Sequence, residues 1–168
     1  MSSNLTTYTT QNDLLLRNLM DYYTSSGLLD KMLSIITGES KISLRIVDWF
    51  ATNYAKKNYT TYVIEGSNER RFKVYVDYKL KLKAYSKKRF DPFCRWDRIS
   101  VPYKNGTFIE TTIGQLNFFK WALENKVIDY LEECNPSSIY DQDYLLLKIQ
   151  MVYYPIFEVI SLHRIYLI

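Results

Sequence analysis

Strict alternation of apolar and polar side chains distinguishes residues 72–85 from the rest of the chain. Apolar residues take every second position from Phe72 to Ala84, and Lys, Tyr and Asp residues fill the positions between them. A period of two is typical of a strand that buries one face. The pattern therefore predicts a long, half-buried strand that is bent or broken near its end.

Shorter segments on both sides of this stretch predict further strands. Residues 59–65 and 96–103 are strand-like, and residues 107–111 follow Asn105-Gly106, a dipeptide that favours two-residue hairpins. Gly66-Ser67-Asn68 has the composition of a turn. We expect these strands to form one antiparallel meander.

The helical period dominates the two ends of the chain. Helices are predicted over residues 12–24, 28–37, 43–57, 113–124 and 138–154. The expected N-caps are Asn12 or Asp13 for the first helix, Ser43 for the third, Thr111 or Thr112 for the fourth and Ser138 for the last. A strand through residues 46–50 is the alternative to the third helix, and the fourth helix continues or restarts at Asn125.

These elements predict a single α+β domain over residues 1–168, with a central antiparallel β meander flanked by helices. It comprises a helical part (1–58), a basic β part (59–111) and a second helical part (112–168). A chain of 168 residues suits one core, and 47% hydrophobic with 24% charged residues is close to the globular average. Disordered, collagen-like and coiled-coil classes are thereby excluded.

The net charge of +4 is unevenly distributed. Residues 56–104 carry a net charge of +9, whereas residues 1–40 carry −2 and residues 105–168 carry −4. A basic segment between acidic flanks indicates an anionic partner. The alternative is a soluble surface whose charge is merely uneven.

The predicted strand gathers basic and aromatic side chains on its outer face. That face and the turn after it comprise Lys73, Tyr75, Lys79, Lys81, Lys83, Tyr85, Lys87, Lys88, Arg89, Arg95 and Arg98. Lysines neutralise phosphates with release of counterions, and exposed tyrosines stack on unpaired bases. We predict a nucleic-acid-binding surface, for DNA in preference to RNA. The alternative is that the lysines keep a sheet face solvated or protect an edge strand.

Residues that could carry catalysis or bind a metal are few. The chain has two cysteines, Cys94 and Cys134, and one histidine, His163, without the clustered spacing of zinc sites or of a nucleophile–base pair. The acidic pairs Asp91 with Asp97 and Asp141 with Asp143 suit turns and caps. We therefore expect no catalytic residue, no metal and no cofactor.

Two further segments have structural interpretations. Asp91-Pro92 predicts a sharp extended turn, anchored in the core by Phe90 and Phe93. The apolar stretch 144–168 is interrupted by charged residues, so we expect buried core or a protein interface rather than a membrane span. The N-terminus lacks a secretory signal, and the cysteines suit free thiols in a reducing compartment.

Three blocks of the sequence resemble a known group of proteins. They are SLRIVDWFATNYAKKN at 43–58, YKLKLKAYSKKRFDPFCRWDRI at 78–99 and ETTIGQLNFFKWALENKVIDYL at 110–131. In order and spacing they resemble an uncharacterised family of small proteins of nucleocytoplasmic large DNA viruses, of the mimivirus and algal-virus kind. The resemblance covers about half of the chain and supplies no site residues.

The resemblance implies a viral protein, located in the virion or in the viral factory of the host cytoplasm. We expect a non-enzymatic protein that binds nucleic acid in genome organisation or packaging. The alternative is a virion structural subunit, a minor capsid, core or scaffold protein, that acts through contacts with other virion proteins. The oligomeric state is left open.

Overall fold

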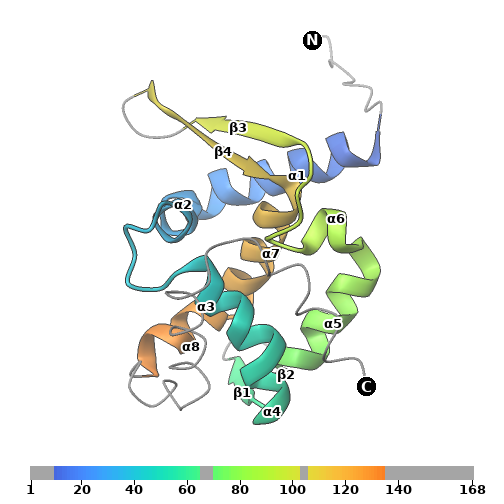
Figure 1. Ribbon diagram of the computed structural model, residues 1–168, viewed down its shortest axis with the longest axis vertical. Coiled ribbons are helices and arrows are strands. Elements are labelled where there is room, and N and C mark those ends of the chain that lie inside the picture. The colour runs from blue at the N-terminus through green and yellow to red at the C-terminus, as the bar shows by residue number, and fades with distance from the viewer. Residues whose placement is uncertain (1–9, 65–69, 103–105, 135–168) are drawn as a thin grey trace, which may run out of the picture. The chain divides into compact units, whose positions relative to one another are not determined.

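The computed structural model describes residues 10–64, 70–102 and 106–134 of the chain (Figure 1). The chain divides into two compact units, Met1–Tyr130 and Leu131–Ile168. Of the second unit, only the end of one helix, residues 131–134, is described. The expected turn at 66–68, the last predicted helix, the apolar tail and His163 lie outside the described residues.

The described residues form helices and two pairs of strands, so the α+β class is confirmed. In chain order the elements are α1 (Gln11–Ser26), α2 (Leu29–Thr37), α3 (Leu44–Trp49), the π-helical turn η1 (Phe50–Tyr54), α4 (Ala55–Lys57), β1 (Thr61–Ile64), β2 (Arg70–Lys73), α5 (Val74–Tyr85), α6 (Lys87–Phe90), β3 (Arg98–Pro102), β4 (Phe108–Thr112), α7 (Ile113–Glu124) and α8 (Val127–Glu133). Strand β1 pairs with β2 and β3 with β4, both antiparallel. The two pairs are separate sheets rather than one meander.

Local signals set most helix boundaries where the sequence predicts them. The Ser43 side chain caps α3 and the Thr112 side chain caps α7. Helices α3, η1 and α4 follow one another without a break, so the helical prediction over 43–57 is confirmed and its strand alternative is wrong. The cap of α1 is Thr10 rather than Asn12 or Asp13, although Asp13 completes a capping box with Thr10.

The long strand predicted over residues 72–84 is wrong. The chain is extended only as far as Lys73, and Val74–Tyr85 is the helix α5. Buried Val74 and Tyr78 are four residues apart and share one side of that helix, whereas Val76 and Leu80 are exposed. The buried residues are therefore spaced as on one side of a helix. This helical spacing, and not the alternation of apolar and polar residues, determines the local structure. The segment 59–111 thus contains helices as well as strands.

Helix α7 is the centre of the core. Almost every residue of α7 is buried, and the helix contacts α1, α6 and β4. Its Phe118 and Trp121 rings pack against Phe90 of α6 and Tyr78 of α5, with ring centroids 5.8–6.3 Å apart. This aromatic cluster holds α5 and α6 on one side of α7 (Figure 1).

Helix α1 is attached to α7 by a buried hydrogen bond. The Tyr23 hydroxyl donates to the backbone carbonyl of Leu116 at 2.7 Å, across 93 residues of sequence. Both residues are almost completely buried. A polar group of this kind is tolerated in a core because its hydrogen bond is made.

The N-terminal turn of α7 lies directly against the end of α6. A Cβ atom built on Gly114 would be 2.8 Å from the carbonyl oxygen of Asp91. Two side chains of α7 secure the approach: the Asn117 amide donates to Arg89 O at 2.8 Å, and the Gln115 amide donates to Pro92 O at 3.0 Å. Only a glycine fits at position 114 without displacing backbone.

The Asp91-Pro92 segment turns as expected, with one correction. Asp91 is extended, and its carboxylate accepts a hydrogen bond from the backbone N–H of Phe93 at 2.9 Å. Phe90 is buried, as predicted. Phe93 is exposed, so its predicted role as a core anchor is wrong. The rings of Tyr78, Phe118 and Trp121 already pack around Phe90, with centroids 5.8–5.9 Å from its own.

Candidate nucleic-acid interface

Helix α5 is held in one orientation by contacts of its inner side. Val74 and Tyr78 are buried, and the Asp77 carboxylate accepts a hydrogen bond from the Trp121 indole N–H at 2.7 Å. A hydrogen bond from a partly buried donor to a charged acceptor fixes direction as well as distance. The opposite side of α5 must therefore face solvent.

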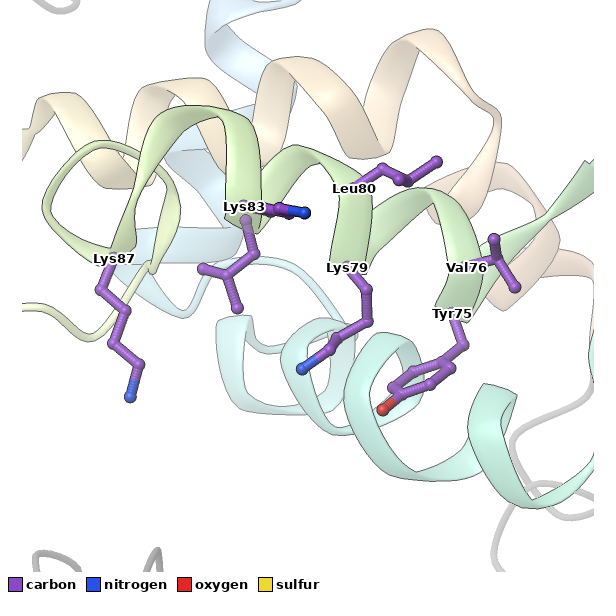
Figure 2. Close-up of a pocket in the computed structure, with 7 residues that line it drawn as sticks. Tyr75, Val76, Lys79, Leu80, Lys83 and Lys87 are labelled. Carbon is purple, nitrogen blue, oxygen red and sulfur yellow. The ribbon is translucent and has the colours of Figure 1, made fainter.

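Two lysines and two apolar side chains make up that solvent side. Lys79 and Lys83 are exposed and four residues apart, so they are neighbours on the helix surface. Val76 and Leu80 lie beside them, 52% and 60% exposed. Figure 2 shows Tyr75, Lys79 and Lys87 directed to one side of the helix, with Val76 and Leu80 on the adjoining side.

An open groove of about 550 Å³ runs along this surface. It is lined by Tyr75, Val76, Lys79, Leu80, Leu82, Lys83 and Lys87. The walls are mainly the apolar parts of these side chains, and three of the lining residues are lysines whose ammonium groups can reach a ligand at the groove. Such a groove can take a polyanion whose phosphates meet the ammonium groups and whose less polar parts lie against the walls.

Lys56 extends the surface from a neighbouring element. It lies in the last turn of α4, and its ammonium is 5.8 Å from the centroid of the Tyr75 ring. Helix α4 contacts α5, so Lys56 lies beside the first turn of α5. We call Lys56, Tyr75, Lys79, Lys83 and Lys87 the basic helix face.

The lysines of the basic helix face are not paired with acidic side chains in the part of the chain that the structure describes. Among the described residues, no carboxylate forms an ion pair with Lys56, Lys79, Lys83 or Lys87. In contrast, Lys31, Lys120 and Lys126 each meet an aspartate or glutamate elsewhere. Lysines without such partners raise the local positive potential and remain available to an anionic ligand.

Several predicted site residues do not belong to this face, because the segment is a helix. Lys81 and Tyr85 are half-buried on another side of α5, and the Tyr85 ring stacks on Phe90 at 6.1 Å. Residues two apart on a helix point about 200° apart, so Lys79 and Lys81 cannot share a face. Lys73 is exposed, but it ends β2 rather than standing in a row with Lys79.

Of the basic residues that follow α5, some line the groove and others do not. Lys87 lines the groove, whereas the Lys88 ammonium lies over the Trp96 ring, 4.1 Å from its centroid. Arg89 is half-buried and donates to the side chains of Asn12 at 2.8 Å and Gln11 at 3.2 Å. Arg89 thus fastens α6 to the start of α1, which engages two of its five N–H donors.

The remaining two arginines lie beyond the turn. Arg95 is exposed in the segment before β3. Arg98 is exposed on β3, and its guanidinium is 3.9 Å from the Glu110 carboxylate on β4. None of the groove-lining residues comes from this hairpin. Lys79, Lys83, Lys87 and Tyr75 are therefore the predicted site residues that the structure brings together, and Lys56 is a member that the sequence pattern missed.

A half-buried carboxyl group lies on α3, outside the groove. Burial raises the pKa of Asp48 on α3 to about 7, with a further contribution from the nearby Asp91 carboxylate, while Arg45 opposes both effects. Burial and the charges of Asp48 and Asp91 also raise the pKa of the Tyr78 phenol. These groups affect the stability of the fold rather than the chemistry of the groove.

Metal-binding groups and membrane-spanning helices are absent from the described residues. No three His, Cys, Asp or Glu residues among them come together as a metal-binding group. Cys94 is a half-buried free thiol. Within the same residues, none of the helices has the length and apolar character needed to cross a bilayer. The absence of catalysis stays a prediction.

Comparison with known proteins places the chain in a family. Residues 2–142 match the model described as "Family of unknown function (DUF7197)". The chain is 50% identical over 107 residues to "Uncharacterized protein L507" of Acanthamoeba polyphaga mimivirus. That match covers 60% of this chain and 41% of the relative, so the chain spans about two fifths of the relative's length. No solved structure matches the chain.

Proposed function

Since the chain belongs to DUF7197, a family of unknown function, we propose its function from its own surface. The protein binds nucleic acid through the basic helix face. The resemblance to proteins of large DNA viruses is confirmed by the mimivirus relative. In such a virus the proposed role is non-enzymatic, in genome organisation or packaging. The protein would act in the viral factory of the host cytoplasm or in the virion.

The observation that carries the proposal is the row of lysines, none of which forms an ion pair within the described residues. Lys79 and Lys83 are one helical turn apart, about 6 Å along the axis, and Lys56 and Lys87 continue the row at its two ends. A linear row of cations suits a polyanion whose phosphates also follow one another in a row. Each phosphate that a lysine neutralises releases a counterion, which favours binding. A compact acidic metabolite would need a cluster instead of a row.

A second candidate function has one observation in its favour. Val76 and Leu80 are exposed beside the lysines, and aliphatic side chains are costly to leave in water. They would suit a virion structural subunit that docks another protein on α5. The lysines at the same groove favour a nucleic acid over an apolar protein surface, because a charged group loses its hydration when an apolar surface covers it.

The proposal predicts a salt-dependent affinity that depends on specific lysines. We expect the double variant Lys79→Gln/Lys83→Gln to bind generic DNA more weakly than the unchanged protein. The slope of log K against log salt should fall by about 0.9 for each phosphate that is no longer neutralised, or about 1.8 in total on duplex DNA. Fluorescence anisotropy of a labelled oligonucleotide over a series of salt concentrations measures this slope.

The matched control for this experiment lies in the same helix. Lys81→Gln removes the same charge as Lys79→Gln, but from the half-buried side of α5. We expect Lys81→Gln to leave the slope unchanged and Lys79→Gln to lower it. Equal effects of the two single variants would show that only net charge matters, and an unchanged slope in the double variant would exclude the basic helix face.

A further inference from the structure

Tyr59 is more exposed than any other large hydrophobic side chain in the described part of the chain. It follows α4, and 88% of its surface is open to solvent. Most of the other described tyrosines are buried or half-buried, as in the stacked pair Tyr62 and Tyr130. A ring so exposed gives the core no packing.

The backbone conformation at position 59 is also unusual for a tyrosine. Its φ is 50°, in the left-handed region that favours glycine. The hydrogen bond from Thr60 N to Ala55 O at 3.1 Å passes around Tyr59, so Tyr59 occupies the position after the helix where glycine is commonest. A tyrosine here costs conformational free energy that no burial of its side chain offsets. Residues kept in such conformations without a structural gain indicate a functional role.

Cationic residues flank this turn in the chain. Lys56 precedes Tyr59 by three residues and leads to the basic helix face through its contact with Tyr75. In the β1–β2 hairpin, Tyr62 and Phe72 form an inward pair, which directs the neighbouring pairs Thr61 with Lys73 and Val63 with Arg71 outward. Those four residues are exposed. Along the chain, the exposed ring of Tyr59 thus stands between the lysines of α4 and the exposed cations of β2.

We infer that Tyr59 stacks on an unpaired base and that the ligand of the basic helix face is single-stranded nucleic acid. The inference rests on the proposed function and specifies its substrate. An exposed aromatic ring beside cations is the usual platform for single strands, because every unpaired base offers a flat face while the cations hold the phosphates. In a duplex the base faces are covered by their neighbours, so Tyr59 would have nothing to stack on.

The test compares one single strand and one duplex of equal length. Labelled oligothymidylate and a labelled blunt duplex are titrated with the full chain at one salt concentration. We expect Tyr59→Gly to weaken binding of the single strand about 5- to 150-fold and to leave duplex binding unchanged. Tyr59→Phe should bind like the unchanged protein, because the ring is retained.

Replacement of Tyr59 with glycine should not unfold the protein, so a change in affinity reports on binding alone. Because glycine adopts φ 50° without strain, Tyr59→Gly should melt at the same or a higher temperature than the unchanged protein. Phe108→Ser is the matched control for loss of an exposed ring, since Phe108 is 66% exposed on β4, in the other hairpin. It should leave the affinity for oligothymidylate unchanged.

The possible results separate this inference from the proposed function. If Tyr59→Gly leaves single-strand binding unchanged, or weakens both probes equally, base stacking by Tyr59 is wrong while the lysine experiment still decides nucleic-acid binding. If the unchanged protein binds only the duplex, the single-strand substrate is wrong. If it binds neither probe at low salt, both proposals fail, and a self-association lost in Tyr59→Gly would instead identify a protein interface.

Discussion

At the scale of single residues, the backbone of Ser86 is the most unusual in the described chain. Ser86 separates α5 from α6 with φ 67° and ψ 164°, a combination that is almost confined to glycine. Its N–H still donates to Leu82 O at 3.0 Å, and its carbonyl accepts from Arg89 N at 3.2 Å. Two helices are thus joined through one strained residue. This junction sets the direction in which α6 leaves α5, and Lys83 and Lys87 on its two sides line the same groove.

Replacing Ser86 with glycine should stabilise the protein. Strain of this kind costs about 1–3 kcal/mol, and the added freedom of glycine in the unfolded chain costs about 0.4–1 kcal/mol. A net gain near 1 kcal/mol corresponds to a melting temperature about 2–4 °C higher for a chain of this length. Differential scanning calorimetry measures the change. Ser86→Ala retains a Cβ atom and should bring no gain, so an equal gain in both variants would contradict the argument.

At the scale of elements, the close approach of α6 to α7 gives a second prediction. Alanine is a better helix former than glycine by about 1 kcal/mol, so propensity alone predicts that Gly114→Ala stabilises α7. The Asp91 carbonyl at 2.8 Å from the new Cβ predicts the opposite. We expect the clash to dominate and the free energy of unfolding to fall by about 1–3 kcal/mol. Urea unfolding measures it, and a rise in the midpoint would show that the two helices can separate freely.

Helix α5 shows why the sequence predicts some elements and misses others. Its apolar residues fit a period of two, but Val74, Tyr78 and Leu82 also fit a helical stripe. Two signals favoured the helix: a run of twelve residues is long for a strand, and Leu, Lys and Ala at 80–84 are good helix formers. The elements with a local cap, such as those that begin at Ser43 and Thr112, were predictable because the cap and the helix are adjacent in sequence.

The sequence predicts part of the candidate site. Lys79, Lys83 and Lys87 belong to the predicted basic set because charge is visible in sequence. Which side of the chain each lysine occupies depends on the helix, so the alternation places Lys81 with Lys79, whereas α5 places them on different sides. The hydrogen bond that orients Arg89 joins it to Asn12 across 77 residues. No local pattern could show such a bond.

At the scale of the whole molecule, stability should depend on pH through Asp48. Its folded pKa of about 7 lies above its ordinary value of 3.8, so the folded protein holds a proton that the unfolded chain releases. The stability contributed by this proton is complete below pH 4 and is lost as pH rises through 7, by at most about 4 kcal/mol. Asp48→Asn cannot ionise. We therefore expect the variant to gain stability relative to the unchanged protein between pH 5 and pH 8, measured by denaturant unfolding.

Asp129 supplies the control for this pH dependence. Burial alone would raise the pKa of Asp129, but hydrogen bonds and charges from Lys31 and Lys126 lower it below its ordinary value. Asp129 is therefore ionised at both pH 5 and pH 8. Asp129→Asn should change the stability by the same amount at the two pH values. A pH-independent effect of Asp48→Asn would show that Asp48 is already ionised in the folded protein.

The bond between Tyr23 and Leu116 also governs the order of events during synthesis. The ribosome makes α1 first, yet the carbonyl that its tyrosine needs is 93 residues away in α7. At about 5–20 residues per second, that carbonyl is made about 5–20 s later. During this time the apolar side of α1 has no native partner in α7. A nascent chain of this protein therefore presents an uncovered helix to its surroundings for seconds, which is the condition under which chaperones bind.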